Sequence, residues 1–302
     1  MPALAPPPPI PTGDRPILAL VGPTASGKTA LALDWAERLQ TEIISADSVQ
    51  IHIDLDIGSA KPSPDELARV RHHGLSLLSP EERPSAGRWV ELVTPAIEGL
   101  HARGRVPIVC GGTGLYVRAL LDGLAEIPAV PAEVRAEVLS RLEHLGSDAL
   151  HKELANIDPT AAARISPRDP QRVTRALEVY VATGTPITTW QRETTHKPNY
   201  QSHIVALEID RETLGRRIAT RAAAMMAAGL VDEVRGLLTR YPSDCPGLTT
   251  LGYREVVAAI RDGELDVSTL TGRLTLAHRQ YAKRQQTWFA RAHADTRLPT
   301  PS

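Results

Sequence analysis

Short apolar runs alternate with stretches of helical periodicity over the first 123 residues of the chain. The runs at Pro16 to Val21 (PILALV), Glu42 to Ser48 (EIISADS) and Val106 to Cys110 (VPIVC) predict buried strands. Residues 30–39 (ALALDWAERL) predict a helix, and the apolar spacing between Pro64 and Arg103 predicts two more around a loop. This alternation predicts a parallel sheet covered by helices, with ligands outside the carboxyl ends of the strands.

The pattern changes after Gly123, because residues 128–180 show helical periodicity and almost no strand signal. A strand signal returns at residues 203–210, followed by amphipathic helix over 212–240, interrupted near Gly229, and a last helix over 267–292. We therefore expect an α/β core domain formed by residues 15–124 and 197–302. Residues 125–196 are expected to form an inserted all-helical domain.

Composition narrows the class of protein. A chain of 302 residues has ample core for both parts, and its two cysteines, Cys110 and Cys245, indicate neither a disulfide framework nor a metal site. Residues 1–14 are proline-rich, do not have the pattern of a signal peptide, and are expected to form a disordered tail. No apolar run reaches the length of about 18 residues typical of a membrane span, so we expect a soluble, cytoplasmic protein.

Charge is distributed unevenly along the chain. The formal net charge of -1 argues against indiscriminate nucleic-acid binding. From Leu270 to Ser302, however, six lysines and arginines stand against one acid, Asp295, so this end of the chain is basic.

The most specific motif is G-x-x-x-x-G-K-[ST], a phosphate-binding loop (P-loop) that lies between the first predicted strand and its helix. Its glycines permit a tight turn, its amides and the helix N-terminus attract phosphate, and its lysine adds positive charge. Thr29 could ligate Mg²⁺, and a chance match in a turn is the much weaker alternative. The predicted diphosphate-binding residues are Gly22, Pro23, Thr24, Ala25, Ser26, Gly27, Lys28 and Thr29.

A P-loop indicates a diphosphate, of which ATP is one source. In a P-loop NTPase a second apolar strand usually ends in a magnesium-binding Asp, whereas residues 106–110 run into Gly111 and Gly112. The run that does reach an acid is 42–48, and Asp47 would face the P-loop if the two strands were neighbours. Asp47 could then accept a proton from a nucleophile. A helix cap or an Asx turn is an equally good interpretation of Asp47.

Seven ordered blocks over residues 17–291 resemble the tRNA dimethylallyltransferase family, also called tRNA isopentenyltransferases or IPP transferases. Seven blocks in this order are far less probable by chance than a single block would be. They read GPTASGKTALA, DSVQIHIDLDIGSAKP, GGTGLYVRALLDGL, DPQRVTRALEVYVATG, GLVDEV, GYREV and RQYAKRQQTWF.

The resemblance implies a P-loop NTPase-like fold and prenyl transfer from dimethylallyl diphosphate to the exocyclic amine of the adenine 3′ of the tRNA anticodon. It implies Mg²⁺ and no consumption of ATP, with Asp47 as the general base. Lys28, Thr113 and an arginine are the other implied catalytic residues, and of Arg217 and Arg221 we favour Arg221. Without the resemblance, a solvated helix face is the better interpretation of both arginines.

The same resemblance implies contacts to the anticodon stem-loop. Tyr253 or Trp288 could stack on an unpaired base, although a buried aromatic is the commoner role. For Thr113 the alternative is a role in packing. For the arginines between 164 and 175 the alternative is ordinary surface charge. The implied tRNA contacts are Asp47, Ser48, Val49, Gln50, Thr113, Arg135, Gln171, Arg172, Val173, Thr174, Arg175, Thr249, Thr250, Leu251, Gly252, Tyr253 and Arg254.

The chain departs from the family pattern at several positions. His52 stands where Tyr is usual, Ser59 where Thr is usual, HHGLSLL where HHLID is commoner, and TWFA where TWFR is usual.

The adjacent His72 and His73 lack spaced partners and make a poor metal site. No protein partner is implied, and we expect a monomer.

Two other functions fit the motifs alone. A small-molecule kinase would use the P-loop and Asp47 for ATP and an acceptor hydroxyl, and would turn over ATP without tRNA. An RNA-binding protein that only senses nucleotide would keep its function without Asp47.

Overall fold

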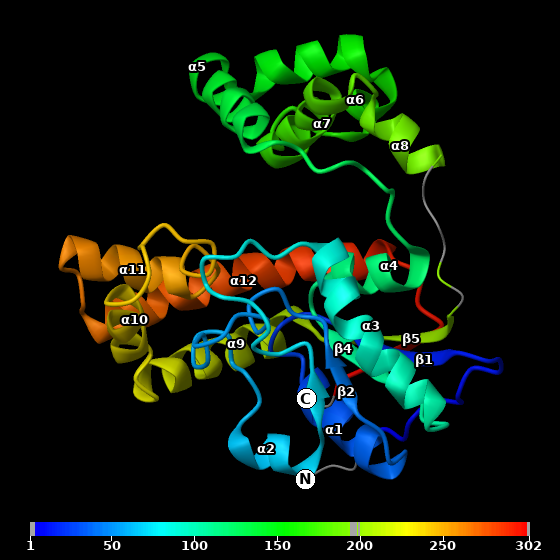
Figure 1. Cartoon of the computed structure of the whole chain (residues 1–302). Helices are drawn as coiled ribbons and strands as arrows, with labels where there is room; N and C mark the ends of the chain where they lie inside the picture. Colours follow the sequence, from blue (N-terminus) through cyan, green and yellow to red (C-terminus); the bar gives the residue numbers. More distant parts are fainter. Residues whose placement is uncertain (1–3, 194–197, 199, 301–302) are drawn as a thin grey trace. The chain divides into compact units, whose positions relative to one another are not determined.

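The computed structural model describes residues 4–193, 198 and 200–300 (Figure 1). The chain divides into two compact units, one formed by residues 1–121 and 199–302, the other by residues 122–198. We call them the α/β unit and the helical unit and describe each by itself.

The α/β unit contains a six-stranded sheet in which every strand pair is parallel. The strand order is β3-β2-β4-β1-β5-β6, which confirms the predicted parallel α/β fold. The two edge strands were not predicted, because their sequences, HH and TRLP, contain no apolar run. The strands are β1 (Pro16–Val21), β2 (Ile43–Ser45), β3 (His72–His73), β4 (Ile108–Gly111), β5 (Gln201–Glu208) and β6 (Thr296–Pro299).

The helices of the α/β unit follow the predicted periodicities closely. The interruption near Gly229 separates α9 from α10, where Gly229 adopts a left-handed φ of 93° that glycine tolerates best. The α11 helix was not predicted as an element. The helices of this unit are α1 (Lys28–Arg38), α2 (Pro64–Arg69), α3 (Ala86–Ala102), α4 (Gly114–Asp122), α9 (Arg211–Ala227), α10 (Leu230–Leu238), α11 (Tyr253–Asp262) and α12 (Val267–Arg291).

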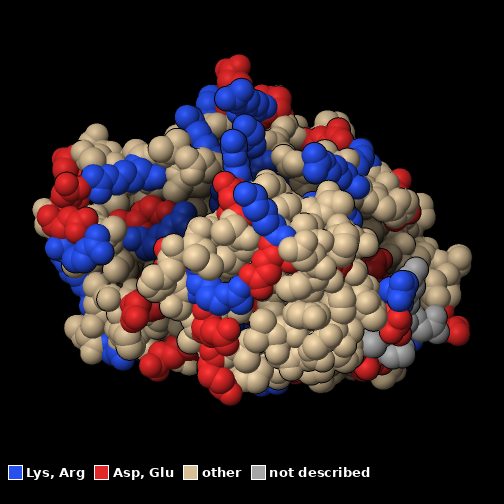
Figure 2. Space-filling model, turned by 90° about the horizontal axis from the view of Figure 1, so that it is seen from above, with Lys and Arg blue, Asp and Glu red and all other residues tan. Residues whose placement is uncertain are grey.

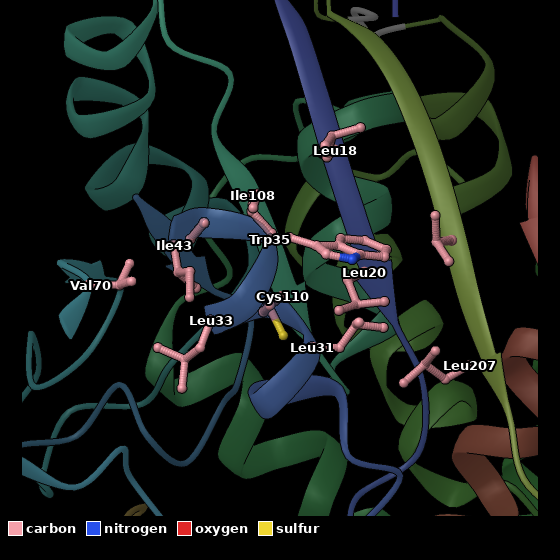
Figure 3. Close-up of a cluster of buried hydrophobic side chains, with 13 residues drawn as sticks. Leu18, Leu20, Leu31, Leu33, Trp35, Ile43, Val70, Ile108, Cys110 and Leu207 are labelled. Carbon is pink, nitrogen blue, oxygen red and sulfur yellow. The ribbon is translucent and has the colours of Figure 1, made fainter. Parts of the chain in front are cut away.

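One hydrophobic cluster fixes α1 against the sheet (Figure 3). Leu18 and Leu20 alternate along β1 and point to the same face, where they meet Leu33 and the fully buried Trp35 of α1. Each large apolar side chain buried here contributes about 1.5–3 kcal/mol. Because α1 follows the P-loop directly, this packing also fixes the loop.

The start of the chain differs from the predicted disordered tail. The Trp35 indole Nε1 donates a hydrogen bond of 2.8 Å to the carbonyl oxygen of Ala5. Leu4 and Ala5 also pack against the same cluster. The buried indole needs an acceptor, and Ala5 provides one, so this part of the tail lies on the core. Residues 1–3 lie outside the described part of the chain.

The helical unit has its own core. Val138, Leu150 and Leu154 of α5 pack against Val173 and Leu177 of α7. Gly146 interrupts α5 with a non-helical φ of 77°. Its helices are α5 (Ala132–Ile157), α6 (Pro159–Arg164), α7 (Pro170–Thr183) and α8 (Ile187–Glu193).

No described helix combines the length and apolar character needed to cross a membrane. On the face shown in Figure 2, lysines and arginines are interspersed with acidic side chains.

Candidate active site

The P-loop forms a tight turn at the carboxyl end of β1. Ser26 N donates to the carbonyl oxygen of Pro23 at 3.3 Å, and Ala25 and Gly27 have left-handed φ values of 62° and 89°. Gly27 is the N-cap of α1 and supplies no side-chain hydrogen bond to its first turn. The amides of that turn are therefore open to an anion, and the helix dipole favours one.

Three strand ends bring the predicted loops together. β4 lies between β1 and β2, with Val21 opposite Gly111 and Ser45 opposite Cys110. The strands that precede the P-loop and Asp47 are therefore not neighbours, since β4 separates them. The second strand also ends at Ser45, two residues before Asp47. The Ala46 carbonyl oxygen accepts a 3.1 Å bond from Thr113 N, so the loop carrying Asp47 is tied to the glycine-rich turn after β4.

A cavity of about 260 Å³ opens at this edge of the sheet, within the α/β unit. It brings together the P-loop, the loop after β2 and one face of α12, which lie far apart in the sequence. Its lining includes Thr24, Lys28, Asp47, Ser48, Val49, Gly58, Ser59, Arg221, Thr249, Thr250, Leu251, Arg254, His278, Tyr281, Arg284 and Gln285.

Asp47 both forms a turn and faces the cavity. Its Oδ1 accepts hydrogen bonds from the backbone N–H groups of Val49 at 2.8 Å and Gln50 at 3.3 Å. Among the described residues, Oδ2 has no hydrogen-bond partner. The Asx-turn interpretation is therefore correct for one oxygen, and that turn holds the other oxygen ready for a ligand.

Two tyrosines stand near this carboxylate. Burial raises the pKa of the Tyr116 hydroxyl, and the negative charge of Asp47 raises it further. The same two causes raise the pKa of Tyr281 to about 12. Both phenols therefore stay protonated near neutral pH.

Two cationic side chains that are poorly solvated, Lys28 and Arg221, line the cavity. Burial lowers the pKa of Lys28, and the charge of nearby Asp47 acts against that shift. The Lys28 ammonium donates to the carbonyl oxygen of Pro23 at 3.3 Å. Burial also lowers the pKa of Arg221, whose Nε is enclosed and has no partner among the described residues. An anion bound between them would satisfy both groups.

Arg217 lies on the same helix as Arg221 but faces the P-loop backbone. Its Nη1 donates to the carbonyl oxygen of Ser26 at 3.3 Å. Arg217 is absent from the residues that line the cavity, whereas Arg221 lines it. The geometry therefore favours Arg221 as the cavity arginine.

Thr113 and Gln50 support the loop after β2 from behind. Ser48 N donates to Thr113 Oγ1 at 3.1 Å, and Thr113 Oγ1 lies 3.4 Å from the Ser48 hydroxyl. The Gln50 amide donates to the carbonyl oxygen of Ala60 at 2.9 Å. Neither residue lines the cavity, whereas Ser48 and Val49 do. The predicted residues around Asp47 thus lie together, and Thr113 and Gln50 support the loop that carries them.

The predicted run from Thr249 to Arg254 divides into two parts. Thr249, Thr250, Leu251 and Arg254 line the cavity. Tyr253 is fully buried, and its hydroxyl donates to Glu233 Oε1 at 2.8 Å, so the interpretation of Tyr253 as a base-stacking residue is wrong.

Trp288 remains partly exposed on α12. The guanidinium carbon of Arg118 lies 5.7 Å from the centroid of its ring. Stacking of Trp288 on a base therefore stays a prediction.

The predicted tRNA contacts of the helical unit also divide by burial. Gln171 and Arg172 are exposed, and Arg135 and Arg175 are half-buried. Val173 and Thr174 face the unit's core, because helical periodicity turns them inward. Val173 is completely buried there, and the buried Thr174 hydroxyl donates to the carbonyl oxygen of Pro170 at 2.9 Å. The prediction that the side chains of Val173 and Thr174 contact tRNA is therefore wrong.

Two departures from the family pattern have structural roles. His52 is fully buried, and its Nδ1 donates to the carbonyl oxygen of Ser79 at 2.9 Å. The Ser59 hydroxyl donates to the carbonyl oxygen of Leu55 at 2.6 Å and lies at the cavity wall. Both side chains thus stabilise the loop between β2 and α2.

The sequence did not single out His278, Tyr281 or Gln285, although all three line the cavity from α12. Tyr281 and Gln285 are four residues apart, and His278 precedes Tyr281 by three, so they share one helical face. Tyr281 and Gln285 also lie in the block RQYAKRQQTWF that carries the family resemblance. Neither the spacing nor the block could show which side of α12 faces the P-loop.

Comparison with known proteins identifies the family of this chain. The family model described as IPP transferase matches residues 50–292, and the one described as isopentenyl transferase matches residues 16–76. The tRNA dimethylallyltransferase of Anaeromyxobacter dehalogenans (strain 2CP-1) is 45% identical over 91% of this chain and 90% of its own length. That of Halorhodospira halophila is 44% identical over 94% of each chain.

Solved structures give the same result. The tRNA isopentenylpyrophosphate transferase of Bacillus halodurans superposes with a TM-score of 0.67 at 37% identity, over 94% of this chain and 89% of that one. A eukaryotic dimethylallyltransferase acting on tRNA superposes with a TM-score of 0.79 at 25% identity, over 95% of this chain and 74% of that one. By sequence and by fold, this chain belongs to the IPP transferase family.

Proposed function

We propose that this chain transfers a dimethylallyl group from dimethylallyl diphosphate to the exocyclic amine of the adenine 3′ of a tRNA anticodon. Its relatives are tRNA dimethylallyltransferases, and one of the similar structures is of an enzyme described as acting on tRNA. The observation that carries the proposal is one cavity with a cationic end at Lys28 and Arg221 and a free carboxylate oxygen on Asp47. This arrangement suits a nucleophilic amine attacking a carbon attached to diphosphate.

The donor diphosphate binds at the first turn of α1. The amides of that turn have no side-chain cap, and Lys28 lies beside them in the cavity. The half-buried guanidinium of Arg221 supplies charge from the facing helix α9. These groups stabilise the diphosphate as negative charge grows on the departing oxygen.

The acceptor adenine binds on the Asp47 side of the cavity. As the amine nitrogen forms its bond to the allylic carbon, the carbon–oxygen bond to diphosphate breaks and its electron pair leaves with the diphosphate. Asp47 Oδ2 takes the amine proton, as a general base must lie within hydrogen-bond reach of that proton. Ser48 and Val49, held by Thr113, form the adjoining wall. The reaction consumes no ATP.

Magnesium fits this site as a companion of the diphosphate. No cluster of three metal-binding side chains occurs among the residues that the structure describes. Mg²⁺ usually keeps several waters and binds through substrate phosphates with one or two protein oxygens. Thr29, exposed in the first turn of α1, can offer its hydroxyl, and Mg²⁺ would neutralise the leaving group when bound.

The tRNA partner is a single-stranded anticodon loop whose target base must be extruded to reach the cavity. Arg172 and Arg175 of the helical unit and the arginines and lysine of α12 would bind its phosphates. We further propose that the chain acts as a monomer.

The test is transfer of labelled dimethylallyl diphosphate to unmodified tRNA in the presence of Mg²⁺. We expect label on tRNA without added ATP, and none on a matched tRNA carrying guanine at the target position. Turnover of ATP without tRNA, combined with no labelled tRNA, would instead indicate a kinase.

A further inference from the structure

Gln285 of α12 joins the two glycine-rich turns of the α/β unit. Its Oε1 accepts a hydrogen bond of 2.8 Å from the backbone N–H of Thr24 in the P-loop. Its Nε2 donates a bond of 2.9 Å to the carbonyl oxygen of Gly112, in the turn after β4. The three residues are distant in sequence, and one planar amide satisfies a donor on one turn and an acceptor on the other.

The fit around this amide is close. Gln285 is only 6% exposed, and a Cβ atom placed on Gly112 would lie 2.2 Å from its Nε2. Tyr281, one helical turn earlier, lines the same cavity. A buried amide with both ends bonded has one stable orientation, so it fixes the separation of what it joins.

The two turns have different partners in the proposed reaction. The P-loop holds the donor diphosphate, whereas the turn after β4 supports Ser48 through Thr113 and thereby the loop that carries Asp47. Their separation therefore sets the distance between donor and acceptor.

We propose that Gln285 is a positioning residue that holds the P-loop at Thr24 and the second glycine turn at Gly112 in the spacing required for diphosphate binding and transfer. This inference rests on the proposed function. Gln285 acts through these two backbone groups and is assigned no chemical step.

The substitution Gln285→Glu gives a specific test. A carboxylate still accepts from Thr24 N–H, but it faces the Gly112 carbonyl oxygen with no proton to donate. A protonated carboxyl group restores both bonds, because its O–H donates to Gly112 while its C=O accepts from Thr24. The activity of Gln285→Glu relative to the natural protein should therefore rise as the pH falls.

Charged and titratable groups around position 285 also affect the ionisation of a glutamate placed there. Positive charge favours the ionised carboxylate, whereas burial and Asp47 favour the protonated form. The groups that share this region are Lys28 of α1, Asp47 after β2, Cys110 of β4, Tyr116 of α4, Arg221 of α9, and His278, Tyr281 and Arg284 of α12.

Two further variants provide controls. Gln285→Met keeps the length of the side chain but can make neither bond at any pH. Gln286→Glu makes the same chemical change at the next position, where the Gln286 amide donates at 3.2 Å to the carbonyl oxygen of Ile209 and bonds to neither glycine turn.

Affinity for inorganic diphosphate with Mg²⁺ is measured by titration calorimetry from pH 5.5 to 8, alongside prenyl transfer and thermal unfolding. At pH 8 we expect Gln285→Glu and Gln285→Met to bind diphosphate about tenfold more weakly than the natural protein, with Gln286→Glu unchanged. On acidification, the loss in Gln285→Glu should shrink while that in Gln285→Met stays constant.

The proposal is overturned if the ratio to the natural protein stays flat with pH for both Gln285 variants, or if Gln286→Glu shows an equal loss. Lower thermal stability with unchanged diphosphate affinity would also overturn it, since that indicates packing alone. If the natural protein binds diphosphate but does not prenylate tRNA, the proposed function fails while the diphosphate series still tests Gln285.

Discussion

The α/β unit and the helical unit use their sequence motifs in different ways. In the α/β unit, residues from the P-loop, the loop after β2, α9 and α12 converge on one cavity, and several of their polar atoms lack partners. In the helical unit, the charged positions of α7 form ion pairs with neighbours, such as Arg172 with Asp169 at 3.4 Å. The first arrangement suits the proposed reaction site, whereas the second offers a charged surface.

Asp47→Asn tests the chemical role of the cavity most strongly. The amide oxygen can still accept from Val49 N–H and keep the turn, but the free carboxylate oxygen is lost. We expect kcat for prenyl transfer to fall by about 100-fold or more, as for loss of a general base. The affinity for diphosphate should change little.

Single-turnover kinetics and calorimetry separate these two effects. Equal losses in turnover and in donor affinity would contradict a role as base. They would reduce Asp47 to a residue that shapes the P-loop side of the cavity.

Lys28→Ala tests the cationic end of the cavity. Lys28 is half-buried beside the open first turn of α1, so its loss removes a charge-assisted bond to the donor. We expect diphosphate affinity to fall by about 10- to 100-fold, from the roughly 1.5–3 kcal/mol of such a bond. Calorimetry with Mg²⁺ and diphosphate measures it, and unchanged affinity would contradict the assignment.

Removing two charges from the helical unit should have a smaller effect. The double variant Arg172→Gln with Arg175→Gln should weaken tRNA binding several-fold and reduce its salt slope by roughly one for each phosphate that is no longer neutralised. Donor affinity should not change. Filter binding at several salt concentrations measures this.

The matched control is Arg235→Gln, which removes an exposed arginine paired with Asp232 at 3.0 Å in the α/β unit. That pair has the same three-residue spacing as the pair of Arg172 and Asp169. If both proteins show the same salt slope as the natural one, the α7 arginines do not bind phosphate.

The smallest effect concerns the acid stability contributed by Glu42, which lies just before β2. Glu42 is buried, which opposes its ionisation, but a 2.6 Å bond from His73 and the charge of Arg103 outweigh burial and lower its pKa. A lowered folded-state pKa gives stability above the ordinary value of 4.5, and this is lost as the pH falls through the folded pKa.

Glu42→Gln should therefore lower Tm at neutral pH and flatten its decline below about pH 4.5. Calorimetric scans from pH 3 to 7 measure this. The exposed Glu91, paired with Arg88, gives the control Glu91→Gln. An equally steep acid decline in Glu42→Gln would show that this carboxylate does not govern it.

The sequence predicted the local structures well, because each has a local cause. The P-loop is defined by the spacing of Gly22, Gly27 and Lys28, and the break before α10 by Gly229. The fold class followed from alternating strands and helices. The position of β4 between β1 and β2 did not, because strand order depends on pairing between distant segments.

The site was predicted only in part, because some of its residues are brought together by the fold and not by a local motif. Lys28, Asp47 and Arg221 were singled out and meet in the cavity. Tyr253 and Val173 were misplaced because a motif does not show which side of a helix is buried. Gln285 was missed because its partners, Thr24 and Gly112, are brought to it only by the fold.

The insertion of residues 122–198 into the α/β unit has a consequence for synthesis on the ribosome. β1 pairs with β4 on one side and with β5 on the other, and β5 begins at Gln201. Nascent chains grow at about 5–20 residues per second, so the insertion adds roughly 4 to 15 s to the time for which one edge of β1 stays unprotected. During that interval the exposed strand is a place for chaperones to act and for aggregation to begin.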